Sequence, residues 1–205
     1  MANLKLNSVT LATESAGTVS LASGTDLSNS AIVYPSGHVV GSKILAKDIP
    51  STCPHISTGN DAFTDTDIAG SFTTVVSSAD SYLVFEFHTG MSHISASASW
   101  GTTTLTLKSS DTTTYATDDD IISTASPTGA YRNRFGGWPH AETYIHQRIR
   151  FIYHAGDLQY PSNLTSYTAG QTLYARLYMA EPSGATFYLV HSSSYYNFTV
   201  QEIMR

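Results

Sequence analysis

The residues between positions 132 and 146 include more side chains capable of chemistry than any other stretch of the sequence. They include two arginines, a Gly-Gly pair, a Trp-Pro pair, a glutamate and two histidines. Imidazole nitrogens and carboxylate oxygens are ligands of transition metals, whereas arginine and tryptophan are typical of binding surfaces. The stretch is therefore a candidate for a metal centre, a ligand-binding loop or a polar turn between two strands.

A metal centre would need both histidines of this stretch at one point. Alternate residues of a strand face the same side, and here these are His140, Glu142, Tyr144 and His146. Residues two apart on a strand are separated by about 7 Å, so His140 and His146 could share a metal only if the chain bent at Pro139. We therefore favour a polar strand face or turn, and expect neither a metal nor a cofactor.

The first part of the stretch, residues 132–140, is better interpreted as a loop that contacts a partner. Binding energy concentrates on arginine and aromatic side chains, and the contact residues predicted on this basis are Arg132, Arg134, Trp138 and His140. The alternative is that Trp138 fills one end of the core, with Gly136-Gly137 permitting the turn, because a large aromatic side chain is buried on average. Both interpretations are open at the level of sequence.

Other candidates for chemistry are weaker. The triplet Asp118-Asp119-Asp120 offers oxygen ligands for calcium, but it lacks the pattern of an EF-hand, and we favour a solvated loop. Cys53 is the single cysteine, so neither a disulfide framework nor a zinc site of several thiolates is expected. No GxSxG, HExxH or glycine-rich phosphate motif occurs. We therefore expect a protein that is not an enzyme.

Composition limits the partners. Hydrophobic residues make up 41% of the 205 residues, which is enough for a real core. The formal net charge is -6, with only 10 lysines and arginines, which argues against nucleic acid or an anionic membrane as the main partner. No apolar run is long enough for membrane insertion, and the first residues do not resemble a signal peptide. We expect a protein made in a cytoplasm and left there, or released without classical secretion.

The elements that must position these residues are strands. Residues 82–88 place Leu83, Phe85 and Phe87 on one face and Glu86 and His88 on the other, which is typical of a half-buried strand. The same alternation recurs at 102–108, 145–153, 172–179, 185–190 and 196–200. Clusters of Gly, Pro, Ser, Asn and Asp separate these segments, and no helical period of any length is present. The pattern predicts an all-β, antiparallel sandwich, specifically a jelly roll.

The first part of the chain differs from the rest. Its apolar residues are separated by small polar ones, so it could form one or two strands but little core of its own. A hinge is predicted at residues 34–38, where Pro35 and Gly37 interrupt the pattern. We therefore predict a short extended N-terminal arm over residues 1–35 and a head domain over residues 36–205.

Four stretches of the head resemble a known family. They are PSGHVV at 35–40, DAFTDT at 61–66 followed by FTTV at 72–75, YTAGQTLYAR at 167–176, and FTVQEI at 198–203. Together they are similar to structural proteins of phages, abundant among marine phages, that have a trimeric jelly roll of the tumour-necrosis-factor type. The resemblance covers about residues 35–205.

The resemblance implies a virion protein that is assembled in the host cytoplasm. Its expected role is that of a tail-fibre or receptor-binding tip, or of an adhesin on the particle surface; the alternative is a capsid decoration protein. A small stand-alone lectin-like domain or hydrolase is the competing class, which both the resemblance and the absent motifs disfavour. The expected partners are two further copies in a homotrimer, other virion proteins bound through the arm, and a host surface glycan. Tyrosines on one side of the sandwich would supply the contact between copies, namely Tyr174, Tyr178 and Tyr188.

Overall fold

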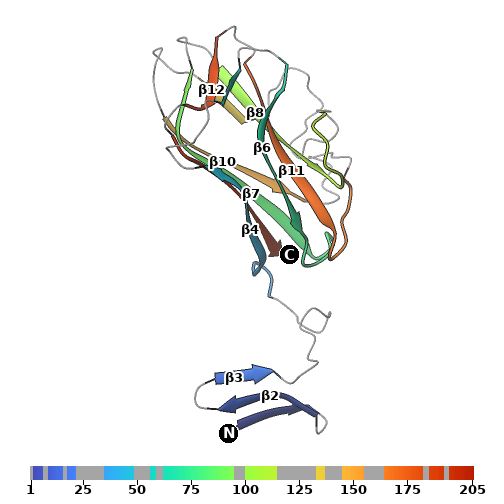
Figure 1. The fold of residues 1–205 in the computed structure, drawn as a ribbon. Helices are drawn as coiled ribbons and strands as arrows, with labels where there is room; N and C mark the ends of the chain where they lie inside the picture. The colour runs from blue at the N-terminus through green and yellow to red at the C-terminus, as the bar shows by residue number, and fades with distance from the viewer. Residues whose placement is uncertain are drawn as a thin grey trace. The chain divides into compact units, whose positions relative to one another are not determined.

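The structure is a computed structural model, which describes twelve segments of the chain. These are residues 2–6, 9–15, 18–21, 35–48, 56–58, 62–94, 100–114, 133–136, 145–154, 164–181, 185–191 and 194–205. Only the backbone is described at residues 2–6, 9–15, 18–21, 56, 57, 94, 100, 133–136 and 145. The chain divides into two compact units, Met1–Pro35 and Ser36–Arg205 (Figure 1). In the described segments no helix is long and apolar enough to cross a membrane.

The N-terminal unit is a small antiparallel sheet with the order β1-β2-β3. Its strands are β1 (Ala2–Leu6), β2 (Val9–Ser15) and β3 (Thr18–Leu21). The sequence predicted an extended arm with one or two strands, and the structure has three strands that pair with one another. Only two residues separate each strand from the next, a length typical of hairpins. Pairing gives the backbone groups of this unit hydrogen-bond partners that an unpaired arm would lack.

The head unit is an antiparallel β-sandwich, as the alternation in the sequence predicted. One sheet contains six strands: β4 (Val39–Asp48), β5 (Ile56–Thr58), β7 (Ser81–Ile94), β10 (Ile145–Tyr153), β12 (Phe187–Val190) and β13 (Tyr196–Met204). The other contains four: β6 (Thr64–Thr73), β8 (Trp100–Lys108), β9 (Asn133–Gly136) and β11 (Thr172–Ala180). Every strand pair in both sheets is antiparallel.

The long strand β7 organises the first sheet. Phe87 pairs with Phe198 of β13 and with Ile149 of β10, so these two strands lie on opposite sides of β7. β4 pairs with the far side of β13, and β12 pairs with the last residues of β7 and with β5. The order β4-β13-β7-β10 thus places strands from the beginning, middle and end of the head side by side (Figure 1).

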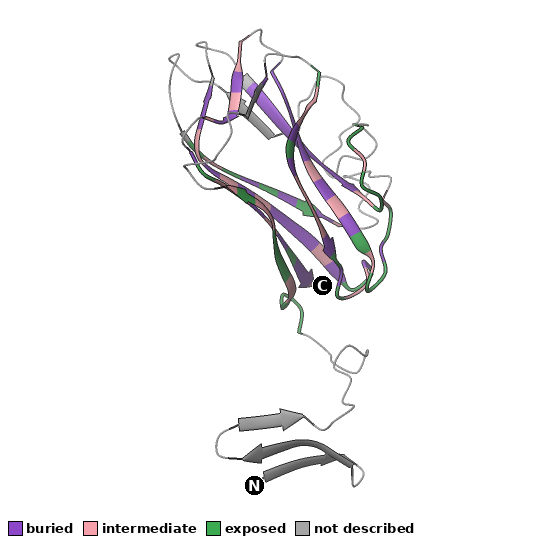
Figure 2. Cartoon of the chain, viewed as in Figure 1, coloured by how far each residue is buried: buried purple, intermediate pink, exposed green. Residues whose placement is uncertain are grey.

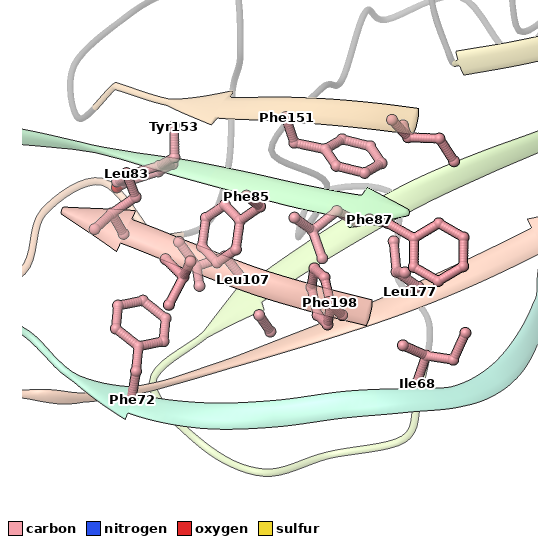
Figure 3. Close-up of a cluster of buried hydrophobic side chains, with 14 of the residues drawn as sticks. Ile68, Phe72, Leu83, Phe85, Phe87, Leu107, Phe151, Tyr153, Leu177 and Phe198 are labelled. Carbon is pink, nitrogen blue, oxygen red and sulfur yellow. The ribbon is translucent and has the colours of Figure 1, made fainter. Parts of the chain in front are cut away.

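The core lies between the two sheets. Leu83, Phe85 and Phe87 of β7 are fully buried, as their alternation predicted, and they face apolar side chains of the other sheet (Figure 3). Across the layers the ring of Phe72 meets that of Phe85 edge to face, with 5.8 Å between the ring centres. Along β10 and the first half of β11, purple and lighter residues alternate in Figure 2, because one face of these segments is buried and the other is more open, whereas residues 101–107 of β8 are buried on both faces.

A buried carboxylate lies near the chain's C-terminus. Glu202 of β13 is 3% exposed and accepts hydrogen bonds from the backbone N–H groups of Val75 and Val76 at 2.6 and 3.1 Å. The hydroxyl of Ser81 donates a third hydrogen bond at 3.1 Å. Because β13 is the last strand and Val75 lies in the turn between β6 and β7, this one side chain ties the chain terminus to a turn in the first half of the head.

Two buried tyrosines stand beside this carboxylate network. The hydroxyl of Tyr167 lies 2.9 Å from that of Ser81, and burial raises the pKa of Tyr167 well above its ordinary value. Tyr153 donates its hydroxyl to the carbonyl oxygen of Leu164. Burial raises the pKa of Tyr153 from 10.0 to about 12. Both phenols are therefore neutral in the folded protein at physiological pH.

Candidate functional site

Most of the contact residues predicted from the sequence lie outside the described residues. Arg132, Trp138 and His140 are among these, so their surroundings are not part of the structure described above. Arg134 lies in β9, where its backbone pairs with Thr102 of β8. The loop predicted over residues 132–140 is therefore interrupted by a strand, because Asn133–Gly136 adds to the open side of β8.

The predicted metal ligands are likewise mostly undescribed. Of the alternating set between 140 and 146, the structure describes the side chain of His146 alone, and it is exposed on β10. The aspartates at 118–120 also lie outside the described residues. Within the described segments, no group of three or more histidines, cysteines, aspartates or glutamates is arranged so that it could hold a metal.

The three tyrosines predicted to form an exposed face do not share one. Tyr178 is 1% exposed, because the segment after β8 covers it and accepts its hydroxyl hydrogen bond at the carbonyl of Thr113, at 2.9 Å. Tyr174 and Tyr188 are half-buried and lie in different sheets. The prediction that these rings form a common contact surface is therefore wrong, since alternation alone does not reveal what covers the outward side of a strand.

A cavity of about 230 Å³ lies on the outward side of the second sheet. Strand register explains its floor. Tyr174 of β11 lies between Lys108 of β8 and Ser71 of β6, and the next outward residue, Arg176, lies beside Thr106 of β8. Three adjacent strands therefore present a platform of hydroxyl and cationic side chains, with the apolar residues of β11 on the opposite side in the core.

The segment that follows β8 forms the wall of this cavity. Ser110, Asp111 and Thr112 line it. Two hydrogen bonds hold the segment against the sheet. The Lys108 ammonium donates to the carbonyl oxygen of Thr114 at 2.7 Å, and the Tyr178 hydroxyl donates to the carbonyl oxygen of Thr113. The sheet and a fastened loop thus enclose the cavity on two sides.

Three carboxylates surround the guanidinium of Arg176. Its Nη1 lies 2.8 Å from Asp65 and 3.9 Å from Asp67, while its Nη2 lies 3.7 Å from Asp111. Arg176 is the least exposed of the four, with 15% of its side chain accessible, whereas Asp67 is 97% exposed. The Asp65 contact is short and partly buried, so it orients the arginine more firmly than the two longer contacts do.

The backbone near Asp65 has the conformation that this arrangement needs. The register between β6 and β11 shifts between Arg176 and Tyr178, and Asp67 has a φ of 59°, a left-handed conformation that aspartate tolerates better than most residues. The N–H of Asp67 donates to the Asp65 carboxylate at 2.8 Å. A bulge in β6 therefore positions Asp65 against the arginine, at the edge of the cavity.

Part of this site was visible in the sequence. The alternation of residues 172–179 predicted that Tyr174 and Arg176 face away from the core. No local pattern joins Arg176 to Asp65, however, because the two are separated by 111 positions in the chain. Chemically, the arrangement offers fixed donors, fixed acceptors and one aromatic ring to a ligand held without covalent bonds.

Comparisons of the chain with models of protein families, with curated proteins and with solved structures found no match.

Proposed function

We propose that the protein is a non-enzymatic structural protein of a phage virion, located on the particle surface as a receptor-binding tip or adhesin. The observation that carries the proposal is the nesting of the strand pairs in the head. From outside to inside these pairs are β4 with β13, β6 with β11, β7 with β10, and β8 with β9. Such nesting favours a jelly roll, an architecture common in viral particle proteins.

This nesting agrees with the resemblance carried by the four sequence stretches, each of which overlaps a strand of the sandwich. The last of them, residues 198–203, includes Glu202, whose carboxylate joins the last strand to the turn after β6. That contact is a physical reason for a glutamate at this position, because a carboxylate is a strong acceptor for these two partly buried backbone donors. The resemblance thus rests on residues that position the strands.

A homotrimer is part of the proposal. Ile44 is 51% exposed on β4 and Ile152 is 40% exposed on β10, and these strands are the two opposite edges of the order β4-β13-β7-β10. In a cyclic homotrimer, one patch of each copy contacts a different patch of the next copy, and the ring closes so that every patch is covered. Apolar residues on opposite edges suit such a contact.

The N-terminal unit would attach the head to the particle. In the order β1-β2-β3, the outer strands β1 and β3 each have one side that pairs with nothing in this small sheet, and such edges accept a strand from another protein. For the receptor side of the molecule we propose contact through Arg132, Arg134, Trp138 and His140, with a host surface glycan as the partner. Capsid decoration is the alternative location on the particle.

Mass spectrometry of purified particles tests the proposal directly. We expect the protein in particles at a constant ratio to the major capsid protein. A variant without residues 2–30 should fold and keep its head, but it should be missing from particles, since the docking unit is gone. Absence of the full chain from particles would refute the virion role, and normal incorporation of the shortened chain would refute the docking role of the first unit.

A further inference from the structure

We propose that the cavity over β6, β11 and β8 is a saccharide-binding site that takes one sugar ring. The inference rests on the proposed contact with a host glycan and deepens it, because it limits the ligand to one sugar ring and places a separate site on the outward face of the second sheet. It does not depend on the residues between 132 and 140.

The lining of the cavity matches the chemistry of a polyol. A sugar presents hydroxyl groups that both donate and accept hydrogen bonds, and the cavity offers both kinds of partner. Asp111 supplies carboxylate acceptors and is 68% exposed. The hydroxyls of Ser110 and Thr112 beside it can donate or accept. Hydrogen bonds to a charged group are the stronger ones, so Asp111 should contribute most of the affinity.

The floor of the cavity provides an apolar surface for the C–H groups of a sugar. Tyr174 is half-buried between Ser71 and Lys108, and its ring has an apolar face and a polar tip. The C–H side of a pyranose ring can pack on that face while hydroxyls at the rim of the sugar meet the polar groups around it. A hexose ring has this same division between an apolar face and a polar rim.

The site is rigid before a ligand arrives. Arg176 is fixed by Asp65 at 2.8 Å, and its guanidinium carries five N–H groups in a fixed plane. The wall is fastened through the Lys108 and Tyr178 hydrogen bonds described above. Groups that are already ordered lose little freedom on binding, so even a small ligand can be held there.

The size of the cavity limits the ligand to a single ring. Its volume of about 230 Å³ lies below the range of about 300–1,000 Å³ typical of pockets for drug-sized molecules. The cavity opens to solvent on the outward side of the sheet, so the rest of a longer glycan could extend away from the protein. We therefore expect weak binding of a monosaccharide and tighter binding when several copies of the head engage one glycan.

The test uses the full chain and an array of immobilised oligosaccharides, followed by titration of the best monosaccharide in solution. The informative variant is Asp111→Asn, which keeps the size of the side chain and removes its charge. The matched control is Asp67→Asn, the same change at an exposed carboxylate near the same arginine but outside the cavity lining. We expect Asp111→Asn to lower the affinity about tenfold or more, and Asp67→Asn to leave it within about twofold.

Three results would overturn the inference: no binding to any sugar of the array, equal affinity of Asp111→Asn and the unchanged chain, or an equal loss in both variants. A further variant, Tyr174→Ala, should abolish binding while the thermal melt stays cooperative. These results are independent of particle mass spectrometry. A protein that binds sugar but is absent from particles refutes the virion role alone, and a virion protein whose sugar binding is unchanged by Asp111→Asn refutes this site alone.

Discussion

Replacing Glu202 by glutamine should destabilise the head strongly, although the change removes only a charge and one acceptor. One carboxylate oxygen accepts from Val75 at 2.6 Å, and the other accepts from Val76 and Ser81 at 3.1 Å each. An amide retains one acceptor oxygen and places an NH₂ group where the second oxygen was. The NH₂ group would then face a backbone donor, and that partly buried donor would lose its partner.

The magnitude follows from these contacts. A hydrogen bond to a charged group contributes about 1.5–3 kcal/mol, and a buried unsatisfied donor costs about 1–3 kcal/mol. The Ser81 hydroxyl can rotate and accept from the new NH₂ group, which recovers part of the loss. We expect a net cost of about 2–3 kcal/mol. For a domain of this size each kcal/mol lowers Tm by about 2–4 °C, so Tm should fall by about 4–12 °C.

The assay is thermal unfolding at one fixed protein concentration, which matters because association raises Tm. The matched control is Glu86→Gln on the outward face of β7. Glu86 bonds Arg148 at 2.8 and 2.9 Å, but 69% of that arginine side chain is exposed, and exposed pairs contribute about 0–1 kcal/mol. If both variants melt within about 2 °C of each other, the structural role given to Glu202 is incorrect.

Two further predictions concern packing and ionisation. Gly101→Ala should cost about 1–3 kcal/mol or more, because a methyl group there would lie 2.3 Å from the fully buried ring of Phe187; an unchanged midpoint of urea unfolding would contradict this packing. Tyr153→Phe should flatten the alkaline loss of stability. The folded pKa of about 12 exceeds the unfolded value of 10.0, so this phenol lowers stability as pH rises between those values, by roughly 1 kcal/mol per pH unit. Urea midpoints measured from neutral pH to about pH 12 should therefore fall less steeply in the variant, and parallel curves would refute the assignment.

The prediction of strands from the sequence succeeded where a segment's own pattern carried the information. Leu83, Phe85 and Phe87 occupy every second position, with Glu86 and His88 on the opposite face, and all three are buried in the core. Residues 172–179 similarly placed Leu173 and Leu177 inside. The sequence also placed a hinge near Pro35, which is where the chain divides into two units. A strand interior and a break are local properties, since both depend on neighbouring residues alone.

The outward faces could not be predicted in the same way. Tyr178 alternates like an exposed residue, yet the segment after β8 covers it. The alternation also did not predict the strand at Asn133–Gly136, because its glycine and polar residues resemble those of a loop. This strand pairs with the edge of β8 that β11 leaves unpaired. What covers a strand, and what it pairs with, depends on elements far away in the chain.

The sequence by itself determined that this protein is built of strands, which side chains of β7 and β11 point into the core, and where the head begins. Only the tertiary structure decided that Arg176 lies against Asp65, that Asp111 stands over the same cavity, and that Glu202 holds the turn after β6. The physical reason is the distance along the chain between the residues that interact. Side-chain direction alternates with a period of two residues that the chain carries locally, whereas these contacts join residues brought together only when separate strands pair in one register.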